Sequence, residues 1–346
     1  MKHITTLSRP RLWKTALATL CAAAFSHMGL AQVPTPTILR IDTANVVLYI
    51  EDTSDPSKFA TDPNVTTPGH PNNFFRNVMI GDIRAVNGQP VLGTFTSTGP
   101  GGGYVRTAPT PGQAIADTVR NGVQVISFEI LKSDGTPIGT IMASGFPAGA
   151  PPPGSPSNVS GSNFVVTGGT GAFLGARGQV GAGNNPPGVP PMRGASITED
   201  PANRRRNGGG STQLVVQLIP MESPEVVMSS DGLAITHSSD FSLVTASKPA
   251  AAGEILSLFA RGLGPVNPGV DPGAPFPSNP LAAVNSPVEV TVNGKPAEVL
   301  SAVGYPGSVG GYQVNFRVPP DAAKGPASIQ VSAAWISGTA VSIPVQ

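Results

Sequence analysis

The chain has 346 residues, including 42 Gly and 38 Pro, and only 12% of its residues are charged whereas 39% are hydrophobic. So many turn-forming residues exclude a helical bundle or a coiled coil, and the apolar content together with the low charge excludes an extended disordered chain. The formal net charge of +1 gives no basis for binding nucleic acid through bulk charge, which leaves a protein of short strands and many turns, long enough for two domains.

Residues 1–31 have the pattern of a secretory signal peptide. Lys and Arg residues precede an uncharged run at 15–25 (TALATLCAAAF), which is too short to span a bilayer and has the length of a signal-peptide core. Small residues at Gly29 and Ala31 predict cleavage after Ala31, and the alternative is a short uncleaved anchor. Cleavage removes the single cysteine, Cys21, and predicts a bacterial periplasmic or extracellular protein without disulfides or a later transmembrane segment.

From residue 38 to 221, within a first domain expected at 32–222, apolar runs alternate with turn signals. Residues 46, 48 and 50 share one face of a predicted strand. Asn87-Gly88 and Asp134-Gly135 predict two hairpins, because these pairs supply the positive φ that tight turns need. The hairpin strands are expected at 77–86 with 89–96 and at 123–131 with 136–143, and further strands at 164–167, 172–180, 195–198 and 213–219. About eight antiparallel strands favour a closed barrel, just wide enough for one small ligand.

Three stretches interrupt this pattern. Residues 151–156 (PPPGSP) and 184–191 (NNPPGVPP) cannot be central strands, because proline lacks the donor that a sheet requires. We expect them to be loops at the mouth of the barrel or tethers. Residues 204–206 (RRR) lie beside three glycines, and we expect a short basic loop tip that is either solvated or in contact with an anion or a surface.

The composition changes near residues 221–224, and we expect a second domain at 223–346. Residues 312, 314, 316 and 318 share one face of a predicted strand, and Asn293-Gly294 predicts a third hairpin. The strands of this domain are expected at 254–260, 288–292, 312–318, 327–333 and 339–345. Short strands at this spacing favour an immunoglobulin-like β-sandwich, although the Cys and Trp pattern of antibody domains is missing.

Residues 164–178 (FVVTGGTGAFLGARG) resemble the signature of the dirigent and allene oxide cyclase-like β-barrel superfamily, in which one strand ends in a G-G-T-G-A-F turn and the next begins G-A-R-G. The resemblance implies an eight-stranded antiparallel barrel with an apolar central cavity, in proteins that are sometimes oligomeric. Glycines at such a turn would permit positive φ and a tight barrel corner. In the cyclases the shape of the pocket guides ring closure, and no residue here can be matched to their active site.

The second domain also carries a resemblance, which covers most of residues 240–346. Its segments resemble, in order, an uncharacterised C-terminal module of large secreted proteins from soil bacteria, related to IPT/TIG immunoglobulin-like domains. The segments are 260–266 (ARGLGPV), 280–281 (PL), 290–297 (VTVNGKPA) and 312–319 (YQVNFRVP). The resemblance implies a secreted or cell-surface accessory domain without a catalytic role. We expect Tyr312 to be a core residue rather than a ligand contact.

Known catalytic patterns are missing from the sequence. After cleavage only His70 and His237 remain, on different domains, so neither a metal site nor a histidine-based redox centre is expected. Ser308, in PGSVG, does not lie in a G-x-S-x-G nucleophile motif. The glycines at 168–171 lack both the spacing and the following helix of a nucleotide-binding loop. We therefore predict no metal and no cofactor.

Two charged residues are candidates for binding a ligand. Glu129 lies in an apolar strand with the parity opposite to Phe128 and Ile130, so it faces either the barrel interior or the solvent. Inside the barrel, loss of solvation would raise its pKa and suit it to proton transfer or to orienting a ligand. Arg177 is a candidate anchor for an anionic ligand, and the alternative for both residues is a solvated or structural role.

The leading hypothesis is a secreted, non-catalytic protein whose barrel binds a small apolar ligand or a cell-surface partner. The immunoglobulin-like domain would space or anchor the barrel. One alternative is an isomerase, a cyclase or a dirigent-type factor that acts in the barrel cavity. Another is a purely structural envelope or adhesion protein.

Overall fold

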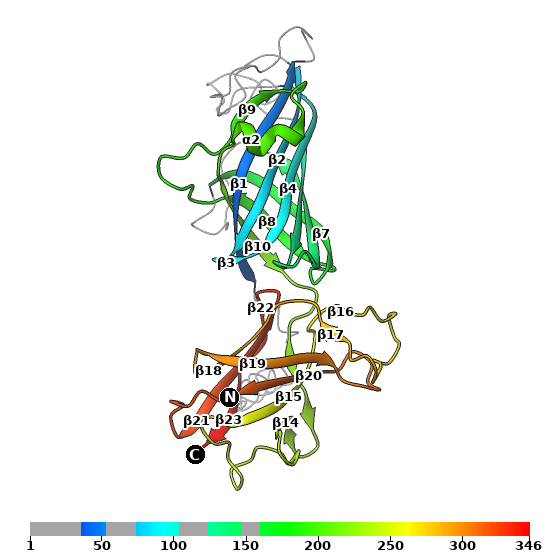
Figure 1. Cartoon of the computed structure of the whole chain (residues 1–346), viewed down its shortest axis with the longest axis vertical. Helices are drawn as coiled ribbons and strands as arrows, with labels where there is room; N and C mark the ends of the chain where they lie inside the picture. Colours follow the sequence, from blue (N-terminus) through cyan, green and yellow to red (C-terminus); the bar gives the residue numbers. More distant parts are fainter. Residues whose placement is uncertain (1–35, 53–73, 104–122, 147–159) are drawn as a thin grey trace, which may run out of the picture. The chain divides into compact units, whose positions relative to one another are not determined.

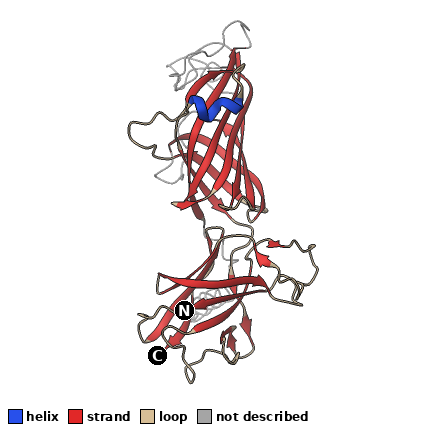
Figure 2. Ribbon diagram, viewed as in Figure 1, coloured by secondary structure: helices blue, strands red, loops and turns tan. Residues whose placement is uncertain are grey.

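Eight antiparallel strands close into a barrel in the N-terminal part of the chain (Figures 1 and 2). The structure is a computed structural model and describes residues 36–52, 74–103, 123–146 and 160–346. The expected signal peptide, the loop at 151–156 and His70 lie outside these residues. Within them, no helix is long and apolar enough to cross a lipid bilayer.

Each barrel strand pairs with its neighbours in sequence, and the last strand pairs with the first. The barrel strands are β1 (Thr37–Asp52), β2 (Phe74–Val86), β4 (Leu92–Gly103), β5 (Gln124–Leu131), β6 (Pro137–Phe146), β7 (Ser160–Gly171), β8 (Arg177–Ala182) and β10 (Gln213–Ile219). The short strand β3 (Gln89–Pro90) also pairs with β2, and β9 (Arg193–Ser196) runs parallel to β1. The predicted all-β fold with an eight-stranded antiparallel barrel is confirmed.

The predicted turn at Asn87-Gly88 joins β2 to the strands that follow. Its φ values are +51° and +79°, as a tight hairpin turn requires. The hairpin at Asp134-Gly135 is also present, but only Gly135 has a positive φ, +87°. Here Lys132 N–H donates to Thr136 O, and the pairing of β5 with β6 shifts by one residue at Leu131. The longer turn with a bulge replaces the two-residue turn that the sequence suggested.

The glycine-rich segment 164–178 forms a corner of the barrel. β7 continues to Gly171, the five residues 172–176 make the turn, and β8 begins at Arg177, later than the strand expected from residue 172. Gly171 has a φ of +61°, which side chains disfavour. Gly178 lies so close to β10 that a Cβ atom there would come within 1.8 Å of Gln217 O. Glycine is therefore required at this corner by both backbone conformation and close approach.

Apolar side chains fill the interior of the described barrel. In β5 the inward residues Ile126, Phe128 and Ile130 are buried, and Phe128 stacks on Phe95 with 5.6 Å between ring centroids. These side chains belong to one core cluster that draws on every barrel strand. A polar group lies on the same inward face, where Gln124 bridges Ser97 and Asn77 at 3.0 and 3.3 Å.

A second sheet follows and curves around its own apolar core. Its longest strand, β19 (Lys295–Gly304), pairs first with β18 (Val288–Val292) and then with β20 (Tyr312–Arg317), and the sheet nearly closes on itself. Its main strands are β14 (Ile235–His237), β15 (Ile255–Arg261), β18 (Val288–Val292), β19 (Lys295–Gly304), β20 (Tyr312–Arg317), β21 (Gly325–Ala333) and β23 (Val341–Val345). Shorter strands are β11 (Glu225–Val226), β12 (Met228–Ser229), β13 (Gly232–Leu233), β16 (Val266–Asn267), β17 (Ala283–Val284) and β22 (Ile336–Ser337).

Two local features of this sheet agree with the predictions from the sequence. Tyr312, Val314 and Phe316 are buried on one face of β20, and Asn293-Gly294 turns with φ values of +51° and +77°. The expected domain boundary at residues 222 and 223 falls between β10 and β11, and the division into two domains stays a prediction.

One turn of the second sheet contributes to the core of the barrel. Ala334 and Trp335 join β21 to β22 in a two-residue turn with φ values of +48° and +63°. Ala334 and Ile336 belong to the apolar cluster of the barrel interior, and Trp335 packs against it. The Trp335 indole N–H donates to Gln89 Oε1 at 2.6 Å. The described residues of the barrel and of the second sheet thus belong to one compact unit.

Candidate ligand-binding site

A pocket of about 520 Å³ lies where the glycine corner of the barrel meets loops of the second sheet. Its walls come from the turn after β7, the end of β10, the loop after β15 and the turn between β21 and β22. It is lined by Gly171, Ala172, Phe173, Leu174, Ala176, Leu218, Pro220, Met221, Glu222, Gly262, Leu263, Gly264, Pro265, Pro272, Ser286, Tyr312, Ala333, Ala334 and Ile336. Most of these side chains are apolar, so the pocket suits an apolar ligand.

Three polar side chains line the pocket. Ser286 is only 4% exposed, and its hydroxyl has no hydrogen-bond partner among the described residues. The Tyr312 hydroxyl donates to Gly264 O at 2.6 Å. Burial and the negative charge of Glu222 raise the pKa of Tyr312. The polar part of the pocket therefore offers one unused hydroxyl and a nearby negative charge.

Both segments that carry a family resemblance contribute to this pocket. The barrel motif supplies residues 171–174 and Ala176, and the second motif supplies residues 262–265 together with Tyr312. Tyr312 is buried in the core of the second sheet as expected, but its ring also lines the pocket. Sequence reasoning missed Ser286, because a lone serine before a proline is typical of any loop.

Glu129 and Arg177, the two residues singled out from the sequence, lie elsewhere. Glu129 is exposed on β5, and because its neighbours Phe128 and Ile130 face the core, its side chain points away from the barrel interior. Arg177 is exposed at the first position of β8. Neither residue lines the pocket.

The arginine run at 204–206 differs from the expected loop tip. It forms a short helix, α2 (Arg204–Asn207), and Arg204 is buried. The Arg204 guanidinium donates to Asp82 Oδ1 and Asn45 O, each at 2.6 Å. Arg205 donates to both oxygens of Asp82, at 2.9 and 3.0 Å. The basic run is therefore held by an ion pair to β2, a partner 122 residues away that a local pattern cannot reveal.

The pKa of Asp82 reflects this arrangement. Burial alone would raise the pKa, but hydrogen bonds from Arg205, Arg204 and Asn45 outweigh it and hold the pKa well below the usual value. Asp82 is consequently a carboxylate at neutral pH, suited to fastening α2 to the outer face of the barrel rather than to proton transfer.

A second ion pair stabilises the same segment of the chain, which lies between β8 and β10. Arg193 donates to both oxygens of Glu199, at 2.7 and 3.0 Å, and to Gly208 O at 2.8 Å. Nearby, the buried Tyr49 hydroxyl has no hydrogen-bond partner among the described residues. Burial and the charge of Glu199 raise the pKa of Tyr49. The Arg193 contacts tie β9 to the segment that follows it, and β9 itself pairs with β1 through the backbone.

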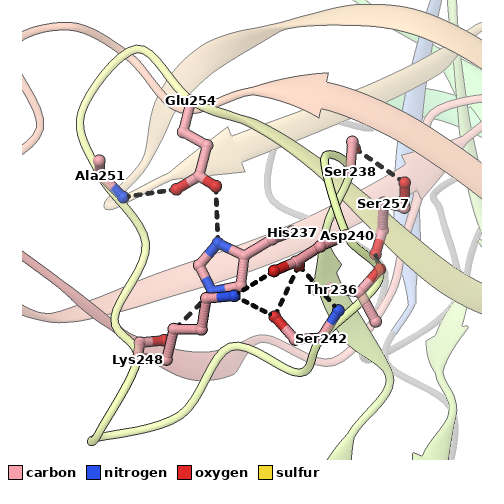
Figure 3. A network of polar contacts seen from close by, with 9 residues as sticks. All are labelled: Thr236, His237, Ser238, Asp240, Ser242, Lys248, Ala251, Glu254 and Ser257. Atoms are coloured by element: carbon pink, nitrogen blue, oxygen red, sulfur yellow. Dashed lines mark hydrogen bonds and ion pairs between the residues drawn. The ribbon is translucent and has the colours of Figure 1, made fainter.

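His237 lies at the centre of a polar cluster in the second sheet (Figure 3). Its Nδ1 lies 2.6 Å from Glu254 Oε1 and its Nε2 lies 3.2 Å from Lys248 O. The donor and acceptor roles of the two ring nitrogens depend on the tautomer of the imidazole. Glu254 Oε2 also accepts from Ala251 N–H at 2.8 Å. The cluster ties the loop between β14 and β15 to the sheet and leaves the imidazole no free nitrogen for chemistry.

Among the residues that the structure describes, no group of three or more His, Cys, Asp and Glu side chains is placed to hold a metal ion. The candidate site is the apolar pocket at the glycine corner of the barrel.

Comparison with known proteins gives little further guidance. No protein-family model matches the chain, and no curated protein matches it. A search of solved structures finds a polysaccharide lyase at 9% sequence identity and a TM-score of 0.18, covering 93% of this chain and 41% of the lyase chain. The chain thus spans less than half of that protein, and a likeness this weak supports no argument about fold or activity.

Proposed function

We propose that this protein is a non-enzymatic binding protein that holds a small apolar molecule in the pocket at the glycine corner of the barrel. The observation that carries the proposal is the pocket itself. Its volume of about 520 Å³ falls in the range of roughly 300–1,000 Å³ that is typical of small-molecule sites, and its mostly apolar wall with a few polar groups is the usual composition.

This proposal moves the ligand from the barrel interior to the end of the barrel. The interior is occupied by core side chains such as Phe95, Phe128 and Ile141 in the part that the structure describes. The resemblance to the dirigent and allene oxide cyclase-like superfamily would instead place a ligand in the interior. Glu129 does not supply a catalytic acid to the barrel interior, because its side chain points outward.

We further propose that the protein is exported through the signal peptide at residues 1–31, and that the second sheet is an immunoglobulin-like accessory module. Its loop at Gly262–Pro265 and its residue Tyr312 form part of the pocket. The module would then help to bind the ligand as well as to space or anchor the barrel. Sequencing the N-terminus of the mature protein tests the export proposal, with Gln32 as the expected first residue.

The binding proposal is tested with a neutral fluorescent probe, N-phenyl-1-naphthylamine, titrated into the mature protein. Leu174 and Met221 line the pocket but are 68% and 67% exposed, so Leu174→Lys and Met221→Lys should fold normally. We expect the double variant to bind the probe at least about ten times more weakly, since a charged side chain disfavours an apolar ligand.

The control is Val165→Lys, on the outer wall of β7, where the side chain is also exposed. It should bind the probe as the wild-type protein does. Equal probe affinity in the wild-type protein and the double variant would show that the pocket is not the binding site.

A further inference from the structure

We infer that the pocket selects an uncharged amphiphile, with an apolar body and one hydroxyl or carbonyl head group beside Ser286, over a carboxylate of the same length. This inference rests on the proposed binding function and names the chemical class of its ligand. It depends on the position of Ser286 and on the charges around the pocket.

Ser286 supplies the polar contact. Its hydroxyl is buried, lines the pocket and has no partner among the described residues. Gly264 lies beside it, and a Cβ atom on Gly264 would come within 3.3 Å of Ser286 Oγ. Because glycine has no side chain, no Cβ atom crowds the hydroxyl on that side. A buried hydroxyl is stable when it forms a hydrogen bond, and a ligand hydroxyl or carbonyl at this point would provide one.

The charges disfavour an anionic head group. Glu222 and Tyr312 are the ionisable residues of the lining, and no Lys, Arg or His is among the lining residues. Arg177 and Arg261 adjoin lining residues in the sequence, but both are exposed and neither lines the pocket. The negative charge of Glu222 reaches the pocket, since it contributes to raising the pKa of Tyr312. A carboxylate would lose solvation here and meet only negative charge.

The apolar wall of the pocket requires that the rest of the ligand be apolar. Phe173, Leu218, Leu263 and Ile336 line the pocket and belong to the buried cores of the two sheets. They would contact a hydrocarbon chain or ring. The hydrogen bond to Ser286 then decides between ligands of equal apolar surface.

The test is competition against bound N-phenyl-1-naphthylamine at pH 7.5 by decan-1-ol and decanoate, two ligands of equal chain length. We expect decan-1-ol to displace the probe at a concentration at least ten times lower than decanoate. Ser286→Ala should reduce the affinity for decan-1-ol about five-fold and leave that for decanoate unchanged. Glu222→Gln should strengthen decanoate binding several-fold, because it removes the repulsive charge without changing the size of the side chain.

Glu225→Gln is the matched control. Glu225 is an exposed carboxylate three residues further along, outside the pocket lining, so its variant should keep the wild-type order of affinities. If decanoate competes as well as decan-1-ol while the probe still depends on Leu174 and Met221, the inferred ligand class is wrong and the binding site stands. If the probe binds regardless of Leu174 and Met221, or not at all, the proposed function itself fails.

Discussion

Asp82 is held by two arginines in different environments, which makes the contribution of burial measurable. Arg204 and Arg205 both donate to this carboxylate, but the side chain of Arg204 is 9% exposed and that of Arg205 is 72% exposed. We predict that Arg204→Ala destabilises the protein strongly and that Arg205→Ala destabilises it weakly, although Arg205 makes the bidentate contact with the Asp82 carboxylate.

The magnitudes follow from what each variant removes. Breaking a buried ion pair costs about 3–5 kcal/mol when the remaining charge has no other partner. After Arg204→Ala, Asp82 keeps Arg205 and an amide hydrogen bond from Asn45 at 2.8 Å, so we expect a loss of about 2–3 kcal/mol in the free energy of unfolding. Water surrounds Arg205, and its removal should cost about 0–1 kcal/mol.

Urea unfolding of the mature protein, followed by circular dichroism, measures both losses if the slope of the transition is unchanged. Arg206→Ala is the control, because Arg206 is exposed on the same short helix. Equal losses for Arg204→Ala and Arg205→Ala, or a larger loss for Arg205→Ala, would refute the argument that burial determines the strength of this ion pair.

Three further predictions concern separate features. The pKa of Asp82 is lower in the folded state than in the unfolded one. Its ionised carboxylate therefore stabilises the folded protein fully above about pH 5, and this stabilisation declines as the pH falls below about 4. The urea midpoint of Asp82→Asn should vary less with pH in that range than the midpoint of the wild-type protein does. In urea unfolding, Ala334→Val should lower the free energy of unfolding by about 2 kcal/mol or more, since a branched side chain fits neither a φ of +48° nor the buried site. Ala334→Gly should change the free energy of unfolding by less than about 1 kcal/mol. His237→Ala should speed hydrogen exchange of the Ala251 N–H at least about ten-fold, because Glu254 loses the partner that positions it.

The features that the sequence predicted correctly depend on neighbouring residues. Asn87-Gly88 and Asn293-Gly294 form tight turns because both residues of each pair adopt positive φ easily. The alternation of β5 and β20 shows directly which side chains are buried. A strand of period two with a turn signal at its end thus defines a hairpin without reference to the rest of the chain.

The features that the sequence did not reveal depend on distant partners. The partner of Arg204 is Asp82, on another strand, and without it a run of three arginines is most simply a solvated loop. The turn at Ala334-Trp335 carries none of the residues that favour positive φ. It is supported instead by burial of Ala334 and by the hydrogen bond from Trp335 to Gln89.

The pocket connects the unusual composition of the chain with its proposed function. Gly, Ala and Pro make up more than half of the lining residues, and these residues have too little side chain to fill the space between the barrel corner and the loops of the second sheet. Large side chains at the same positions would bury more apolar surface and add stability. A cavity kept open by small residues, with a buried hydroxyl left unpaired in its wall, lowers the stability of the folded protein. A bound ligand would offset this loss. We therefore propose that the ligand binds at the pocket and not in the packed interior of the barrel.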